Sequence, residues 1–246
     1  IINNGISIIK NSPVEEINKT QDGLEIIYKE KEKKVTIKTK NIFFSNPLLE
    51  FIKIFNTEIP EEVYKEANKL DYRNHISVHL TIDKKLFDDN WIYVHSPELK
   101  LARISDFTNF SEFMSANNEF PLTLEYFCFE NNEIWNSSNQ EIINFGLAEL
   151  KAIFPVEFNI LHSEVSRNAK AYPVIQTGFE NSINIIKSWL KTQSEITAIG
   201  RSGMFKYNNQ DHAMATGIYA ARNYLGIGKY DPWEVNVDGE YQEEIK

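Results

Sequence analysis

One stretch near the end of the chain decides the fold: Ile196-Thr-Ala-Ile-Gly-Arg-Ser-Gly-Met-Phe-Lys-Tyr-Asn-Asn-Gln-Asp-His-Ala-Met-Ala-Thr-Gly-Ile-Tyr-Ala-Ala-Arg222. Its β-branched beginning, residues 196–199, predicts a short buried strand that stops at Gly200. A polar connection follows, and Asn209 and Asp211 are suited to cap a helix. The order strand, glycine and helix N-terminus places backbone N–H groups where they can meet a polar or anionic ligand.

The predicted helix after residue 209 has two neighbouring faces. Small residues at Ala213, Gly217 and Ala220 share one face, which would let a ligand or a sheet come close to the helix backbone. The adjacent face is apolar, and we expect it to pack in the core. It consists of Met214, Ile218, Ala221 and Leu225.

Composition bounds the class of protein. With 246 residues, 42% of them hydrophobic, the chain can bury a sizeable core in one domain or two. A net charge of -9 argues against a nucleic-acid partner, because neutralising phosphates needs a basic surface. Cys128 is the single cysteine, which excludes an intrachain disulfide and a cysteine-rich metal site and fits a reducing, cytoplasmic setting. The sequence contains no apolar run of about 18 residues, so it predicts no transmembrane helix.

The first 58 residues alternate short strands with a helix. Residues 6–46 are patterned as a run of strands, with a hairpin turn at Asp22-Gly23. The strand at 42–45 stops at Asn46-Pro47, where proline ends strand pairing and can begin a helix. Helical spacing follows at 48–55 and again at 61–70.

From residue 72 the pattern changes to strands. Apolar residues alternate strictly with polar ones over residues 75–82, so one face of the predicted sheet is buried and the other is open. An open sheet face of this kind is a usual wall of a substrate cavity. Beyond it we expect a helix over 139–154, an extended segment over 160–174 and a helix over 178–190.

These patterns predict an α/β (α+β) protein in which a sheet domain interrupts a second domain. The expected boundaries are 1–58 for the first part of the outer domain, 59–175 for the inserted mixed-sheet domain, and 176–246 for the return to the outer domain with a C-terminal helix and a charged tail.

At residues 200–211 the sequence resembles a known signature. Gly200-Arg201 after a strand, then Tyr207-Asn208-Asn209 and Asp211 before the last helix, is similar to the C-terminal signature of the flavin-containing amine oxidase and protoporphyrinogen oxidase superfamily, in the branch near UDP-galactopyranose mutase. Further segments resemble parts of the same superfamily. They are residues 5–17, 42–47, 91–95, Arg103, 109–111, 125–126 and 171–173.

The resemblance implies FAD as cofactor and a small-molecule substrate. It assigns cofactor contacts, on a partial Rossmann-like FAD-binding domain, to Val14, Gly200, Arg201, Asn208, Asn209 and Asp211. It places Arg201 and Tyr207 next to the reacting groups. Each position also has a structural interpretation: an ion pair for Arg201, packing for Tyr207, helix caps for the two asparagines, and a favourable helix-dipole contact for Asp211.

The sequence departs from the superfamily pattern in one respect, the segment that binds the diphosphate of FAD. The Gly-x-Gly-x-x-Gly strand–helix unit that would bind it is not in this sequence, and Gly226 and Gly228 follow a helix instead of preceding one. The chain also begins without an initiator methionine or a signal peptide. We therefore expect the C-terminal part of a longer flavoprotein, whose N-terminal FAD-binding segment is missing here and which binds FAD weakly, if at all, by itself.

Three functions are compatible with these residues. The first is an FAD-dependent oxidoreductase that oxidises a small organic substrate by hydride transfer to the flavin. The second is a sugar-nucleotide mutase, which would need two arginines for a diphosphate: Arg201 with Arg103 or Arg167. The third is a non-catalytic binding module. A metal site is not expected, since His75 and His79 would lie roughly 13 Å apart on one strand.

Overall fold

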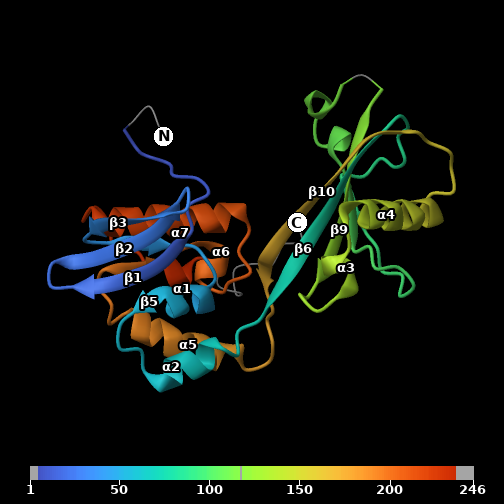
Figure 1. The fold of residues 1–246 in the computed structure, drawn as a ribbon. Coiled ribbons are helices and arrows are strands. Elements are labelled where there is room, and N and C mark those ends of the chain that lie inside the picture. The colour runs from blue at the N-terminus through green and yellow to red at the C-terminus, as the bar shows by residue number, and fades with distance from the viewer. Residues whose placement is uncertain (1–4, 117, 237–246) are drawn as a thin grey trace, which may run out of the picture. The chain divides into compact units, whose positions relative to one another are not determined.

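The computed structural model describes residues 5–116 and 118–236, which form two compact units (Figure 1). The split unit combines residues of Ile1–Asp71 and Pro173–Lys246, and the inserted unit is Tyr72–Tyr172. The predicted charged tail lies mostly outside the described residues. The mixture of helices with antiparallel and parallel strand pairs confirms the predicted α/β class.

One sheet of the split unit has the strand order β3-β2-β1-β5, in which β3, β2 and β1 form an antiparallel meander and the short β5 pairs parallel with β1. The predicted hairpin turn at Asp22-Gly23 is confirmed between β1 and β2. Gly23 has a φ of +139°, and a Cβ there would lie 2.5 Å from the Thr39 carbonyl oxygen, so a larger residue would not fit. Residues 6–10 form no strand, contrary to expectation. The strands are β1 (Val14–Thr20), β2 (Gly23–Glu30), β3 (Lys33–Thr39) and β5 (Phe55–Asn56).

A short parallel pair carries the helices of the split unit. β4 (Ile42–Phe44) pairs with β11 (Ile196–Ala198), so segments about 150 residues apart in sequence meet here. Phe44 stacks on Phe51 at 3.7 Å between ring centroids, and Phe55 extends this aromatic core to Trp189. The helices around it are α1 (Leu48–Ile54), α2 (Glu61–Ala67) and α5 (Phe179–Leu190).

The last helices of the split unit are α6 (Gly200–Gly203), α7 (Gln210–Tyr224) and the 3₁₀ turn η4 (Pro232–Glu234). The prediction that the apolar face of α7 packs in the core was wrong. Met214, Ile218 and Leu225 are 60%, 49% and 65% exposed, whereas Thr216 and Ala220 are buried. The side of α7 that packs is the side that meets the end of β11, because the Gly200 N–H donates to Thr216 Oγ1 at 2.9 Å.

The inserted unit is built on a five-stranded sheet with the order β10-β6-β9-β8-β7. The strands β6, β9, β8 and β7 pair antiparallel. Its elements are β6 (Tyr72–Ile82), β7 (Trp91–Tyr93), β8 (Arg103–Asp106), η2 (Phe107–Asn109), η3 (Glu112–Met114), β9 (Phe120–Cys128), α3 (Glu133–Asn136), α4 (Asn139–Ile153) and β10 (Ile160–Pro173).

One face of this sheet is covered by α4. The predicted alternation is confirmed: the apolar residues 76, 78, 80 and 82 are at most 1% exposed. Gly146 allows α4 to approach closely, since a Cβ there would lie 3.0 Å from Leu124. A capping box between Ser138 and Glu141 begins the helix. None of the helices in the described residues is long and apolar enough to cross a membrane.

Candidate functional site

The candidate site is the connection between β11 and α7. Gly200 follows the strand with a φ of +73°, a left-handed conformation in which a side chain would be strained. Its N–H donates to Thr216 Oγ1, and that hydroxyl donates to the Ala213 carbonyl at 2.7 Å. These two hydrogen bonds therefore fix the first turns of α7 against the end of β11. This agrees with the predicted order of a strand, a glycine and a helix N-terminus.

Arg201, Tyr207 and Asn208 come together in this connection. The Arg201 Nε donates to the Asn208 carbonyl oxygen at 2.6 Å, and the guanidinium carbon lies 5.4 Å from the centre of the Tyr207 ring. The second contact is a cation–π geometry. Arg201 thus closes the loop on itself while Tyr207 remains half exposed to solvent.

Asn208 is the buried polar residue of the site. It is 1% exposed, and its Oδ1 accepts from Asn236 Nδ2 at 3.2 Å. The same Asn236 Nδ2 lies 3.2 Å from the Tyr207 carbonyl oxygen. Among residues 5–116 and 118–236, no group is a hydrogen-bond partner of Asn208 Nδ2. A buried donor without a partner costs about 1–3 kcal/mol, which an acceptor on a ligand would recover.

Asn209 forms the N-cap of α7, as predicted from the sequence. Its backbone N–H donates to His212 Nδ1 at 3.2 Å. Neutral His212 therefore carries its proton on Nε2, which makes that atom a donor. Asp211 lies on the first turn with an exposed side chain, and its Oδ1 is 3.7 Å from His212 Nδ1.

A cavity of about 370 Å³ lies beside this loop. That volume is within the range of small-molecule sites. Of the predicted site residues, Tyr207 and Asn209 line it, while Val14 at the start of β1 does not. The complete lining is Ile175, Phe179, Phe205, Lys206, Tyr207, Asn209, His212 and Asn236. A neighbouring hollow of about 730 Å³ shares His212 and Asn236 with it and reaches Asp211.

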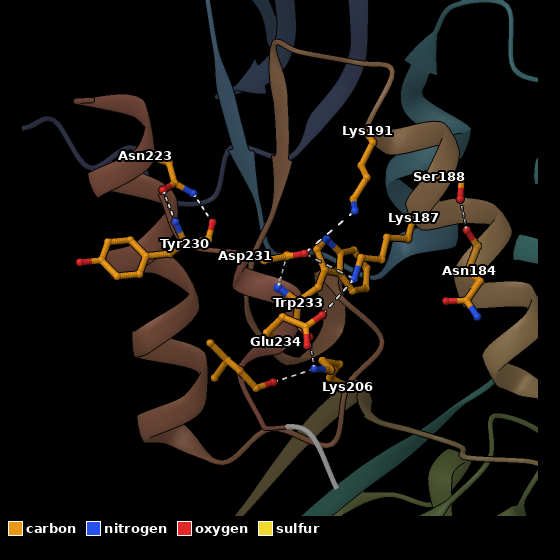
Figure 2. Close-up of polar contacts among 11 residues, drawn as sticks. Asn184, Lys187, Ser188, Lys191, Lys206, Asn223, Tyr230, Asp231, Trp233 and Glu234 are labelled. Atoms are coloured by element: carbon orange, nitrogen blue, oxygen red, sulfur yellow. Dashed lines mark hydrogen bonds and ion pairs between the residues drawn. The ribbon is translucent and has the colours of Figure 1, made fainter. Parts of the chain in front are cut away.

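The segment from Asp231 to Asn236 borders the site, since Asn236 lines the cavity and other residues of the segment line the neighbouring hollow. The sequence interpretation did not include this segment. Figure 2 shows how it is held: Lys206 Nζ donates to the carbonyl oxygens of Trp233 and Val235, at 2.5 and 2.6 Å. Lys206 therefore holds this segment instead of extending into solvent. A sequence signal existed in Asp231-Pro232, an N-cap followed by proline at the first helical position.

Lys187 holds the same segment from α5. Its Nζ lies 3.7 Å from Asp231 Oδ2 and 3.7 Å from Glu234 Oε1, and 5.3 Å from the centre of the Trp233 ring (Figure 2). Its side chain is largely buried, so these contacts are less screened by solvent than those of an exposed lysine. Two lysines from different elements thus hold the segment beside the cavity.

Comparison with known proteins shows which solved structures share this architecture. No protein-family model and no curated protein matches the sequence. Among solved structures, reduced UDP-galactopyranose mutase has a TM-score of 0.76 at 18% identity, over 91% of this chain and 49% of that chain. A candidate protoporphyrinogen oxidase from Exiguobacterium sp. 255-15 has a TM-score of 0.61 at 14% identity, over 78% and 42%. An oxidoreductase from Methanosarcina mazei has a TM-score of 0.51 at 14% identity, over 78% and 44%.

At these identities the likeness defines the fold, which is that of a class of α/β enzymes including oxidoreductases. Within that class the fold is shared with UDP-galactopyranose mutase, and this is the architecture that the resemblance at residues 200–211 predicted. The chain spans about half the length of the solved structures it resembles.

Proposed function

We propose that this chain forms the substrate-binding part and the flavin-ring side of an FAD-dependent oxidoreductase that acts on a small organic substrate. The observation that supports this most strongly is the fold shared with UDP-galactopyranose mutase over 91% of the chain, combined with the strand–Gly200–Arg201 connection at the candidate site. In this proposal the split unit belongs to the cofactor domain and the inserted unit is the substrate domain.

The residues of the site fit one end of FAD. Asn208 Nδ2 is a buried donor that has no partner in the described part of the chain, and Asn209 and Tyr207 border a cavity of suitable size. Amide groups can bond ribityl hydroxyls or ring carbonyls. When bound, FAD would supply the hydride acceptor. Asn208 and Asn209 would hold its ribityl and ring end, with contacts from Gly200, Asp211 and Val14, while Arg201 and Tyr207 would border the substrate.

The diphosphate would be held elsewhere. The sequence has no Gly-x-Gly-x-x-Gly unit, so we propose that a strand–helix segment outside these 246 residues supplies that contact. The split unit offers a surface for it. β4 pairs only with β11 within the described residues, and parallel sheets are normally covered on both faces.

That surface is apolar. Phe43 on β4 is partly exposed and meets Tyr224 of α7 edge to face at 6.0 Å between ring centroids. Next to Tyr224 on α7 lies the exposed stripe of Met214, Ile218 and Leu225. A strand added beside β4, followed by a helix on this stripe, would bury both.

A sugar-nucleotide mutase is the second candidate, favoured by the TM-score of 0.76 to UDP-galactopyranose mutase. It requires a second arginine for a diphosphate. Arg167 already donates to Asn139 Oδ1 and to the Ser137 carbonyl oxygen, and Arg103 is paired with Glu125. Both arginines therefore have established roles in the inserted unit, which weighs in favour of the oxidoreductase.

The test compares the protein expressed from its complete reading frame with the 246-residue chain. We expect the complete protein to purify with visible flavin absorbance and the shorter chain to retain none. Ile218→Glu in the complete protein should abolish flavin retention while leaving the shorter chain folded, because Ile218 is exposed there. Leu161→Glu, at an exposed position on β10, is the matched control.

A complete protein that is colourless and takes up no added FAD would refute the proposal and leave a non-catalytic binding module. Turnover of UDP-galactopyranose under reducing conditions would replace the oxidoreductase with the mutase.

A further inference from the structure

Residues 231–236 lie beside the candidate site, and we call them the strap. The strap faces α7 across the hollow of about 730 Å³, whose lining comes from the first half of α7 on one side and from residues between 229 and 236 on the other. Its last residue, Asn236, also lines the cavity of about 370 Å³. The position of the strap therefore determines how far both hollows are open to solvent.

The beginning of the strap is firmly anchored. Asn223 of α7 bonds both backbone groups of the preceding residue: its Nδ2 donates to the Tyr230 carbonyl oxygen at 2.6 Å, and its Oδ1 accepts from the Tyr230 N–H at 2.8 Å (Figure 2). Pro232 is buried, and its ring restricts the backbone at this point. Residues 230–232 thus form a fixed end, about which the rest of the strap can turn.

The last four residues of the strap are held by polar contacts. None of these four described residues is buried. Lys206 Nζ donates to the carbonyl oxygens of Trp233 and Val235, and Lys187 Nζ lies 3.7 Å from a carboxylate oxygen of Glu234 (Figure 2). Segments with little apolar burial open locally at low cost. A few hydrogen bonds and charges therefore determine whether this end of the strap stays in place.

Asn236 is the tip of the strap and contacts the loop of the candidate site. Its Nδ2 lies 3.2 Å from the Asn208 Oδ1 and 3.2 Å from the Tyr207 carbonyl oxygen. Its φ of +55° is in the left-handed region, which asparagine adopts more readily than most residues. These contacts join neutral groups, so each is weaker than a bond from the Lys206 ammonium.

We propose that the strap is a lid with a latch. Residues 230–232 are its hinge, and the Lys206 ammonium is the latch that keeps residues 233–236 closed against the α7 side of the hollow. Lys206 also lines the smaller cavity, so the latch is part of the candidate site. Because the two hollows share His212 and Asn236, movement of the strap joins them into one site open to solvent.

The role of the lid in admitting a flavin or a substrate rests on the proposed function, whereas the opening of the lid does not. The test therefore uses the 246-residue chain without flavin and places a cysteine on the side of α7 that the strap covers. Ala215 is partly buried and lines the larger hollow, whereas Ala220 of the same helix is 3% exposed and does not line it. Ala215→Cys is the probe, and Ala220→Cys is the matched control for unfolding of α7.

Each cysteine is labelled with a maleimide attached to a polyethylene glycol chain, which is too bulky to enter the closed hollow. The native Cys128 is buried, and the chain without an added cysteine gives its background rate. We expect Lys206→Met to accelerate labelling of Ala215→Cys about tenfold to a hundredfold, the effect of losing two hydrogen bonds from a charged donor. Asn236→Ala should accelerate it about two- to tenfold, as expected for bonds between neutral groups.

Lys191→Met is the matched control for the charge. Lys191 is exposed and lies 4.0 Å from a carboxylate oxygen at the fixed end of the strap, so its replacement should leave the labelling rate unchanged. Labelling of Ala220→Cys should stay slow in every variant.

Equal labelling of Ala215→Cys with and without Lys206→Met and Asn236→Ala, in chains that circular dichroism shows to be folded, would overturn the lid. Equal acceleration of Ala220→Cys would also overturn it, because α7 itself would then unfold. If Lys206→Met does not fold, the rate for Asn236→Ala decides the outcome. None of these results depends on flavin retention by the complete protein, so failure of this inference and failure of the proposed function are distinguishable.

Discussion

Replacing Gly203 by alanine tests how α6 sits on the parallel strand pair. A Cβ at this position would lie 2.8 Å from the Phe44 carbonyl oxygen and 3.0 Å from Ser45 Cα. Both are backbone atoms of the β4 end, so relief requires moving α6 or the strand. The close approach that the sequence led us to expect at Gly217 of α7 is instead found at Gly203.

The magnitude follows from two opposing effects. Overpacking a close contact costs about 1–3 kcal/mol. Alanine recovers at most about 1 kcal/mol of helix propensity, and less in a helix as short as α6. We expect Gly203→Ala to lower the free energy of unfolding of the split unit by about 1–2 kcal/mol.

Gly217→Ala is the matched control, because a Cβ there would meet nothing within 4 Å. In the interior of α7 it should raise stability by up to about 1 kcal/mol. Urea unfolding followed by Trp189 and Trp233, both in the split unit, measures the two variants. A Gly203→Ala chain as stable as the parent, or one that shifts in the same direction as Gly217→Ala, would refute the proposed packing.

Two further predictions concern charged groups. Lys206→Ala should lower the local opening free energy of the Trp233–Val235 segment by about 1.5–3 kcal/mol, since two charge-assisted hydrogen bonds are lost. Hydrogen exchange measures this, with the exposed Lys191→Ala as a control that should change little, and equal exchange in both variants would contradict the clamp. Glu125 has a folded-state pKa below its ordinary value of 4.5, so its contribution to stability is present above that pH and is lost as the pH falls through the lowered folded value. Urea midpoints of the inserted unit should fall more steeply in acid for the parent than for Glu125→Gln, and parallel profiles would exclude this linkage.

Local patterns in the sequence were enough to predict most elements. Alternation over residues 75–82 identified the buried face of β6, and the Asp22-Gly23 pair identified the first hairpin. The cap at Asn209 was predicted because its chemistry is local: a side chain or backbone group a few residues away satisfies the first N–H groups of the helix. Each of these depends on neighbours within one or two turns of the chain.

The apolar face of α7 could not be assigned in this way. Its period shows that Met214, Ile218 and Leu225 share a side, but not which surface that side meets. Thr216 was buried instead, because the Gly200 N–H at the end of β11 needs an acceptor there. Likewise, Lys206 contacts Trp233 and Asn236 contacts Asn208, in each case about 28 positions away in sequence. Rules of residue spacing within one helix or strand do not predict such contacts.

The sequence alone determined the α/β class and the strand–Gly200–Arg201 connection, because hydrophobic period, turn chemistry and capping depend on adjacent residues. The tertiary structure decided that Asn208 has a buried donor without a partner among the described residues, and that two lysines hold the segment from Asp231 to Val235. It also decided that His75, Glu125 and Arg103 meet on one sheet face. Strand register and helix packing bring these groups together over 22 to 50 residues of sequence, and only the folded chain fixes those distances.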